Sequence, residues 1–181
     1  MKNFIYNEMM LHIPVCTSKD PQNVLIISND STDLVKEMNK HTAIAHKTIA
    51  CGVEALREEA DSAYDVVVCE SANDAAISAH ISRVLKEDGL VSMVHPSLDN
   101  VQDNKSIMQI LGKYFKIIMP YNLGNNETAL LASKEYHPTA DINLHRTDML
   151  DNLEYYNCDV HPASFAMGNN IRKEYLGIIK N

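Results

Sequence analysis

Two short polar segments of this 181-residue chain carry side chains that could do chemistry. Residues 28–33 follow the apolar run 24–27, and residues 70–74 follow the apolar run 66–69. Sheets of parallel strands bind ligands at the carboxyl ends of the strands, so we expect both segments at one edge. There, the carboxylate of Glu70 could accept a proton from a reacting group or attract a cation. The alternative is that Glu70 is simply solvated at a strand end, and both interpretations stay open.

The charge balance narrows the ligands that such an edge could take. The chain has 16 Lys and Arg residues against 24 Asp and Glu residues, for a formal net charge of -8. Nucleic-acid binding needs clustered cations that neutralise phosphates, so we expect no nucleic-acid partner and no binding to a membrane surface. The acidic segment 28–33 would repel the phosphates of a dinucleotide, whereas it would not repel an amine or a sulfonium.

Cysteine and histidine usage gives no sign of a disulfide framework or a metal site. The four cysteines lie far apart and form no C-x-x-C pair, which predicts reduced thiols and a cytoplasmic protein. The eight histidines show no metal-binding spacing, so no metal site is predicted. The first residues, MKNFIYNEMMLHIPVC, resemble neither a signal peptide nor a membrane span.

Alternating strand and helix patterns must position the polar segments. The pattern predicts strands at 23–27, 42–50, 63–70, 90–95, 116–121 and 128–133, with the last two as an antiparallel pair. It predicts helices at 5–13, 31–40, 52–60, 74–88 and 104–115, with Pro14 ending the first and Gly89 capping the fourth. We therefore expect an α/β fold with a mostly parallel sheet. The predicted single domain, 1–181, comprises an N-terminal helix and linker (1–22), a sheet core (23–134) and a C-terminal helical tail (135–181).

Several segments, in order along the chain, resemble the spermidine synthase family, the polyamine aminopropyltransferases. They are YNEMMLHIP (6–14), VLIISNDSTDLVKE (24–37), YDVVVCESAND (64–74), LKEDGLV (85–91), ASKEYHPTADI (132–142) and YYNCDVHPASFAM (155–167). Each segment alone is weak evidence for the resemblance, but together the segments span most of the chain and follow the order in which they occur in the family. The resemblance implies a Rossmann-like, methyltransferase-type sheet flanked by helices.

The resemblance also predicts that two parts of the family pattern are missing. The first matching motif begins at Tyr6, so the N-terminal β-rich domain of the family is expected to be absent. Between Lys40 and Gly52 there is room for only one strand, so one βα unit is expected to be deleted. In the family, that unit carries an acidic residue that grips the ribose of the ligand.

Family members move an aminopropyl group from decarboxylated S-adenosylmethionine to putrescine, which implies roles for particular residues here. Glu70 matches the proton-accepting Asp of the family, and Asn73 matches a second Asp of the same motif. The other substrate- or cofactor-binding candidates from the matching motifs are Tyr6, Asn7, His12, Ser28, Asn29, Asp30, Ser31, Cys51 and Tyr121. Ser31 replaces an Asp of the glycine loop, and Cys51 replaces an Asp that contacts adenine.

Some candidates have simpler interpretations. His12 follows a helical pattern, and a satisfied, half-buried histidine is favoured over a catalytic one. Asn73 and Asp74 are interpreted first as caps of the helix that begins at Ala75, and Asp30 or Ser31 as a cap of the helix that follows the loop.

Three functions remain open from the sequence. They are aminopropyl transfer with a changed site, a non-catalytic relative that acts as a binding or assembly module, and another transferase that uses S-adenosylmethionine on a small molecule. No tightly bound cofactor is expected, and decarboxylated S-adenosylmethionine is the expected co-substrate, with a small amine or nucleoside as ligand. A homodimer through the sheet edge or the tail is also expected.

Overall fold

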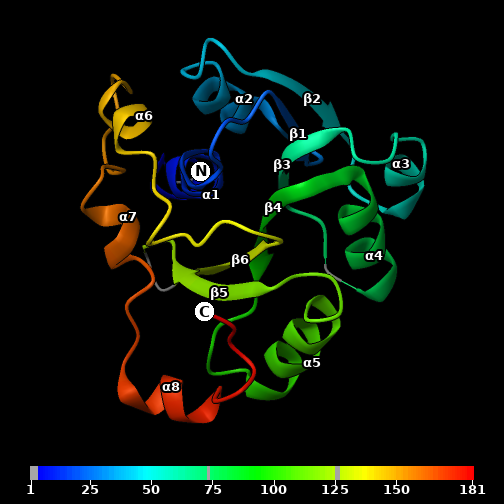
Figure 1. Cartoon of the computed structure of the whole chain (residues 1–181), viewed down its shortest axis with the longest axis vertical. Helices are drawn as coiled ribbons and strands as arrows, with labels where there is room; N and C mark the ends of the chain where they lie inside the picture. Colours follow the sequence, from blue (N-terminus) through cyan, green and yellow to red (C-terminus); the bar gives the residue numbers. More distant parts are fainter. Residues whose placement is uncertain (1–3, 73, 125–126) are drawn as a thin grey trace.

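A six-stranded sheet forms the centre of the fold in the computed structural model, which describes residues 4–72, 74–124 and 127–181 (Figure 1). Its strands are β1 (Asn23–Ile27), β2 (Ala45–Ile49), β3 (Tyr64–Cys69), β4 (Leu85–His95), β5 (Ile117–Asn122) and β6 (Thr128–Ser133). The strand order is β2-β1-β3-β4-β6-β5. The first four strands in this order are parallel, and β6 is antiparallel to both β4 and β5. The predicted α/β class and its closing antiparallel pair are confirmed.

Helices cover both faces of the sheet (Figure 1). Within the described ranges they are α1 (Phe4–Thr17), α2 (Thr32–Met38), α3 (Val53–Arg57), α4 (Ala75–Val84), α5 (Val101–Leu111), α6 (Leu144–Asp148), α7 (Val160–Ala163) and α8 (Asn169–Glu174). Val24 and Ile26 of β1 pack into the core cluster that contains α1 and α2. Leu25 and Ile27 pack into the opposite cluster, with residues of α4 and α5. The alternation follows from the two-residue period of a strand and makes both faces of the sheet apolar.

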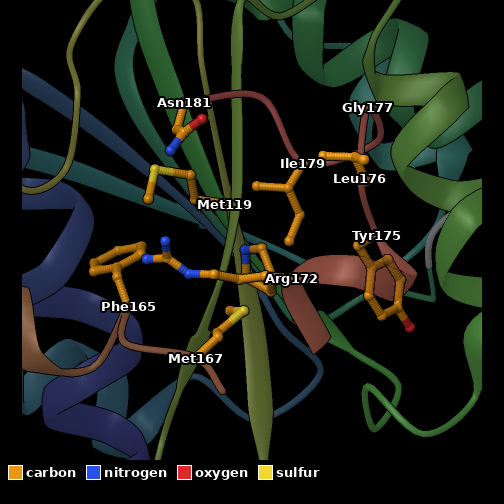
Figure 2. A pocket seen from close by; sticks show the side chains of 10 residues that line it. Met119, Phe165, Met167, Arg172, Tyr175, Leu176, Gly177, Ile179 and Asn181 are labelled. Carbon is orange, nitrogen blue, oxygen red and sulfur yellow. The ribbon is translucent and has the colours of Figure 1, made fainter. Parts of the chain in front are cut away.

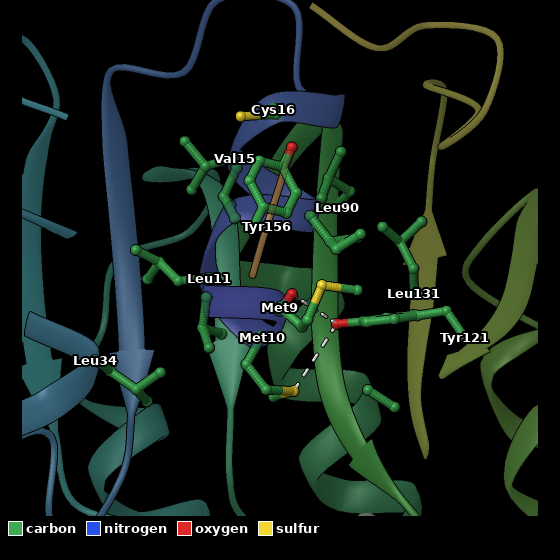
Figure 3. Packing of buried hydrophobic residues seen from close by; sticks show 14 of the residues in the cluster. Met9, Met10, Leu11, Val15, Cys16, Leu34, Leu90, Tyr121, Leu131 and Tyr156 are labelled. Atoms are coloured by element: carbon green, nitrogen blue, oxygen red, sulfur yellow. Dashed lines mark hydrogen bonds between the residues drawn. The ribbon is translucent and has the colours of Figure 1, made fainter. Parts of the chain in front are cut away.

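Helix α1 continues past Pro14 to Thr17, so the prediction that proline ends this helix was wrong. Eleven residues of α1 are buried, and Figure 3 shows Met9, Met10 and Leu11 packed among sheet residues. The tail also supplies donors for the end of the helix. The Arg146 guanidinium donates to the carbonyl of Val15 at 2.8 Å and to that of Ser18 at 2.7 Å. Packing and this distant cap outweigh the hydrogen bond that proline removes.

The predicted Gly89 cap was also wrong, because α4 ends at Val84 and Gly89 lies inside β4. Leu85 is the C-cap residue and is almost fully buried. The ammonium of Lys134 donates to the carbonyls of Ser82 and Leu85, at 2.8 and 2.9 Å. A lysine from a distant strand end thus satisfies carbonyls that a left-handed glycine cap would otherwise serve.

The two edges of the sheet differ. At β5, the N–H of Ile118 donates to the carbonyl of Lys180 at 2.8 Å, and the N–H of Asn122 donates to that of Ser164 at 2.9 Å. Pro120, between them, has no N–H to offer. The opposite edge strand, β2, is exposed over residues 45–48 and leads within three residues to α3. This short connection agrees with the expected loss of one βα unit.

No helix in the described part of the chain combines the length and the apolar character needed to cross a membrane.

Candidate functional site

Glu70 and Ser28 lie side by side at the carboxyl edge of the sheet. Ser28 directly follows β1 and Glu70 directly follows the neighbouring β3. The N–H of Glu70 donates to the carbonyl of Ile27 at 2.8 Å, so the backbone pairing continues one residue beyond the strand. The Ser28 hydroxyl donates to Oε2 of Glu70. Two segments that the sequence singled out are therefore joined at the edge where such sheets bind ligands.

Tyr6 brings the start of α1 into the same group. Its hydroxyl donates to Oε1 of Glu70 at 2.8 Å. Burial, followed by the charge of the Glu70 carboxylate, raises the pKa of the Tyr6 phenol well above its ordinary value. The phenol therefore stays protonated at physiological pH and holds the carboxylate in one orientation. Tyr6, Ser28 and Glu70 are called the Glu70 group below.

The loop that replaces the glycine-rich turn is an ordinary turn with its own hydrogen bonds. The N–H of Asp30 donates to the Ser28 hydroxyl at 3.1 Å, and Asp30 Oδ1 accepts the N–H of Thr32 at 3.3 Å. Ser31 occupies the N-cap position of α2 but makes no side-chain capping bond. Among described residues other than glycine, positive φ angles occur at Ser62 and Asn152, outside this loop. The loop therefore has no backbone conformation that requires glycine.

Asn29 and Cys51 tie this loop to the end of β2. Asn29 Oδ1 accepts the backbone N–H of Cys51 at 3.0 Å. The Cys51 thiol lies 4.0 Å from the carbonyl of Ile27 and is half-buried. Both residues thus lie at the same sheet edge as Ser28, with the amide oxygen of Asn29 engaged by backbone.

His12 and Tyr121 each take part in a buried set of polar contacts away from the Ser28–Glu70 pair. His12 Nδ1 is 2.9 Å from His41 Nε2, and His12 Nε2 is 3.0 Å from Glu37 Oε2. The His12 side chain is fully buried, not half-buried as expected. Tyr121 is also fully buried, and its hydroxyl lies 2.5 Å from that of Ser92 and 3.4 Å from the carbonyl of Met9 (Figure 3). Burial raises the pKa of Tyr121, which suits a neutral core phenol.

Asn7 and the loop after Glu70 complete the predicted set. Asn7 is buried, and within the described ranges its Oδ1 has no hydrogen-bond partner. Asn73 lies outside the described residues. Asp74 is the N-cap of α4 and accepts the N–H of Ile77 at 2.8 Å, so its predicted capping role is confirmed.

Sequence reasoning missed Glu8 and His95. The Glu8 carboxylate accepts the backbone N–H groups of Glu154 and Tyr155 at 2.9 Å and of Tyr156 at 2.7 Å. It thereby joins the first family-like motif to the last. His95 ends β4 at the carboxyl edge, is buried, and has no partner at either ring nitrogen in the part of the chain described. The signal that identified Glu70, a polar residue after an apolar strand, could have found His95.

A pocket of about 190 Å³ lies elsewhere, between β5 and the C-terminal segment (Figure 2). Met119, Phe165, Arg172 and Leu176 are among its lining residues. No predicted site residue lines this pocket, so it is separate from the Glu70 group. Within the described residues, no group of three or more His, Cys, Asp or Glu side chains is placed to hold a metal ion.

Comparisons with known sequences find relatives along nearly the whole chain, although no protein-family model matches it. The polyamine aminopropyltransferase of Helicobacter acinonychis (strain Sheeba) is 26% identical over 205 residues, covering 95% of this chain and 78% of the relative. That of Thermotoga petrophila is 27% identical over 226 residues, covering 97% and 75%. Both alignments are longer than this chain, so these relatives contain internal residues that it lacks, as a deleted βα unit predicts.

Solved structures share the fold. Spermidine synthase from Thermotoga maritima matches with a TM-score of 0.83 at 23% identity, covering 98% of this chain and 75% of that one. A spermidine synthase in complex with the transition state analogue AdoDATO gives 0.82 at 22% identity, covering 95% and 75%. Haemonchus contortus phosphoethanolamine N-methyltransferase 2, in complex with S-adenosyl-L-methionine, gives 0.53 at 16% identity, covering 86% and 43%. This chain is thus similar in sequence, along nearly its whole length, to polyamine aminopropyltransferases, and it shares the methyltransferase-like fold of spermidine synthases.

Proposed function

We propose that this chain transfers an aminopropyl group from decarboxylated S-adenosylmethionine to a small amine such as putrescine, at the Glu70 group. The observation that carries the proposal is a carboxylate held at the ligand-binding edge of the sheet by Tyr6 and Ser28. The relatives' name, polyamine aminopropyltransferase, supports the reaction. The ligands of the structural neighbours, AdoDATO and S-adenosyl-L-methionine, support a sulfonium nucleoside as co-substrate.

The proposed reaction is a displacement at carbon. The amine nitrogen attacks the aminopropyl carbon bonded to the sulfonium sulfur, the carbon–sulfur bond breaks, and its electron pair goes to sulfur. The products are methylthioadenosine and an aminopropylated amine. Glu70 accepts the proton that the attacking nitrogen loses, and its negative charge attracts a cationic acceptor before the reaction. Tyr6, kept protonated, orients the Glu70 carboxylate.

A second candidate function is binding without turnover, and two observations favour it. Each oxygen of Glu70 already accepts a hydroxyl from the chain itself, one from Tyr6 and one from Ser28. The loop after β1 has no glycine, and Asn29 is engaged by the Cys51 backbone. In this alternative, the Glu70 group ties α1, β1 and β3 together, and the fold serves as a binding or assembly module.

Release of methylthioadenosine from decarboxylated S-adenosylmethionine, with putrescine present, tests the first function. We expect Glu70→Gln to lower the rate by about 100-fold or more, because an amide cannot accept the proton. Glu58→Gln, the same change at an exposed residue at the end of α3, is the matched control.

Three results would redirect the proposal. Unchanged turnover in Glu70→Gln would remove Glu70 from the reaction. Stabilisation by the co-substrate without any product, over a panel of small amines, would favour binding alone. No thermal shift with millimolar methylthioadenosine or co-substrate would overturn the transfer reaction and would leave an assembly role as the remaining candidate. Turnover with acceptors other than amines would instead indicate another type of transferase.

The proposal extends to a cytoplasmic homodimer. The four cysteines, all within the described ranges, form no disulfide, which suits a reducing compartment. The exposed edge of β2 suits strand pairing between two copies, whereas the tail occupies the edge of β5.

A further inference from the structure

A second pocket, of about 320 Å³, lies near the amino ends of the parallel strands, whereas the Glu70 group lies at their carboxyl ends. Its walls are the turn 40–44, which leads into the amino end of β2, and residues 143–150 around α6, the gold helix of Figure 1. Cys51, by contrast, follows the carboxyl end of β2.

One wall of this pocket ends a buried series of hydrogen bonds. His41 lines the pocket, and its Nε2 is 2.9 Å from His12 Nδ1. His12 Nε2 is 3.0 Å from Glu37 Oε2, and the Lys40 ammonium is 2.7 Å from the same oxygen. The series therefore runs from the pocket into the interior, as His41, His12 and Glu37.

The chemistry of the series determines which nitrogen carries each proton. The ionised Glu37 carboxylate can only accept, so His12 Nε2 carries the hydrogen. Burial lowers the pKa of His12, so its Nδ1 is unprotonated and accepts from His41 Nε2. Burial, followed by the electrostatic effects of His12, Arg146 and Lys40, lowers the pKa of His41 to about 3, while the charge of Glu37 opposes them. Neutral His41 thus has an unprotonated Nδ1, which can accept a hydrogen bond.

Cations complete the pocket, and no Asp or Glu of the described residues lines it. Arg146 donates to the carbonyls of Val15, Ser18 and Lys19, which leaves two of its five N–H groups for a ligand. Lys40 is held by Glu37 and by the carbonyl of Asn152, which leaves one N–H. A wall of this kind is notable in a chain with a net charge of -8.

We propose that this pocket binds a small oxyanion that also carries an O–H group, such as hydrogen phosphate or a 2-hydroxy acid. The anionic oxygens lie against Lys40 and Arg146, and the O–H donates to Nδ1 of His41. Ile44, Met149 and Leu150 line the rest of the pocket and cover the apolar part of an organic ligand. The proposal does not depend on the reaction at Glu70.

Two matched pairs of anions test it by calorimetry and thermal shift at constant ionic strength and neutral pH. Phosphate and sulfate share shape and negative charge, but only phosphate has an O–H at this pH. Lactate and propionate differ only in a hydroxyl. We expect the O–H member of at least one pair to bind about fivefold or more tightly than its partner, as one hydrogen bond would give. The pair that discriminates identifies the source of the oxyanion.

Variants and a spectroscopic signal locate the binding. His41→Gln should abolish the discrimination, whereas His46→Gln, at an exposed position in β2, and Glu70→Gln should not. If His41→Gln fails to fold, the nitrogen-15 shift of His41 Nδ1 in the unsubstituted protein should still move as the preferred anion is added. Equal binding within both pairs, or an unmoved Nδ1 signal at saturation, would overturn the proposal.

Discussion

Mild acid should destabilise this protein sharply, because several histidines are buried in neutral form. Burial lowers the pKa of His95 and of His161 from 6.5 to about 4. Burial and nearby charges lower the pKa of His41 to about 3. His12 shifts in the same direction, again chiefly through burial. The perturbation is a fall in pH from 8 to 5.

The direction in which stability changes with pH depends on whether the unfolded or the folded state binds more protons. In the unfolded chain, these histidines take up protons as the pH falls through about 6.5. In the folded protein, they stay neutral until the pH falls to about 4. Their contribution to stability is therefore complete above about pH 6.5 and is lost as the pH falls toward the folded values. At pH 5, each of His41, His95 and His161 lowers the free energy of unfolding by about 2 kcal/mol, or about 6 kcal/mol together. A domain is typically stable by only about 5–15 kcal/mol.

Urea unfolding followed by circular dichroism at several pH values between 8 and 5 measures this effect. Over most of this range the carboxylates stay ionised, so the histidines dominate the slope. The slope of the free energy of unfolding against pH reflects the number of protons taken up on unfolding. His95→Phe should reduce that number by about one, which lowers the slope by about 1.4 kcal/mol per pH unit. The exposed His46, changed to Gln, should leave the slope unaltered. A urea midpoint that stays constant from pH 7 to 5, or an unchanged slope in His95→Phe, would refute the argument.

Three further changes test other parts of the fold. Glu8→Gln should lower the free energy of unfolding by about 3 kcal/mol, because an amide cannot accept all three N–H groups that the carboxylate binds, and a loss below about 1 kcal/mol in urea unfolding would contradict this. Tyr6→Phe should lower the rate of methylthioadenosine release by about tenfold while the melting temperature changes little, and an unchanged rate would show that Glu70 needs no orienting hydroxyl. Thr48→Pro, on the exposed edge of β2, should shift a dimer toward monomer in light scattering, whereas an unchanged mass would exclude this edge as the interface.

The sequence predicted best where local patterns coincide with burial. β1 and β6 have the predicted bounds, because each is a run of buried residues between polar turns. The N-cap role of Asp74 was also predictable from its position. The ends of α1 and α4 were not, since the donors that satisfy their carbonyls come from Arg146 and Lys134, far along the chain.

In the candidate site, too, local patterns identified the residues, whereas distant contacts determined how they meet. Glu70, Ser28 and Tyr6 were all identified from the sequence, but their meeting depends on a contact between residues 64 positions apart. Tyr6 and His12 belong to one motif, yet six residues of helix turn their side chains about 120° apart. His12 therefore enters the interior with His41 and Glu37 while Tyr6 reaches the sheet edge.

By itself, the sequence determined the kind of fold, the order of its elements and the polar segments at the strand ends, because these follow from local periodicity and from recognisable motifs. Only the tertiary structure decided which polar groups pair. Glu8 binds the backbone of Tyr156, 148 positions away, and Asn29 binds that of Cys51. A buried polar group must find a partner wherever the fold places one, and no local pattern encodes that choice.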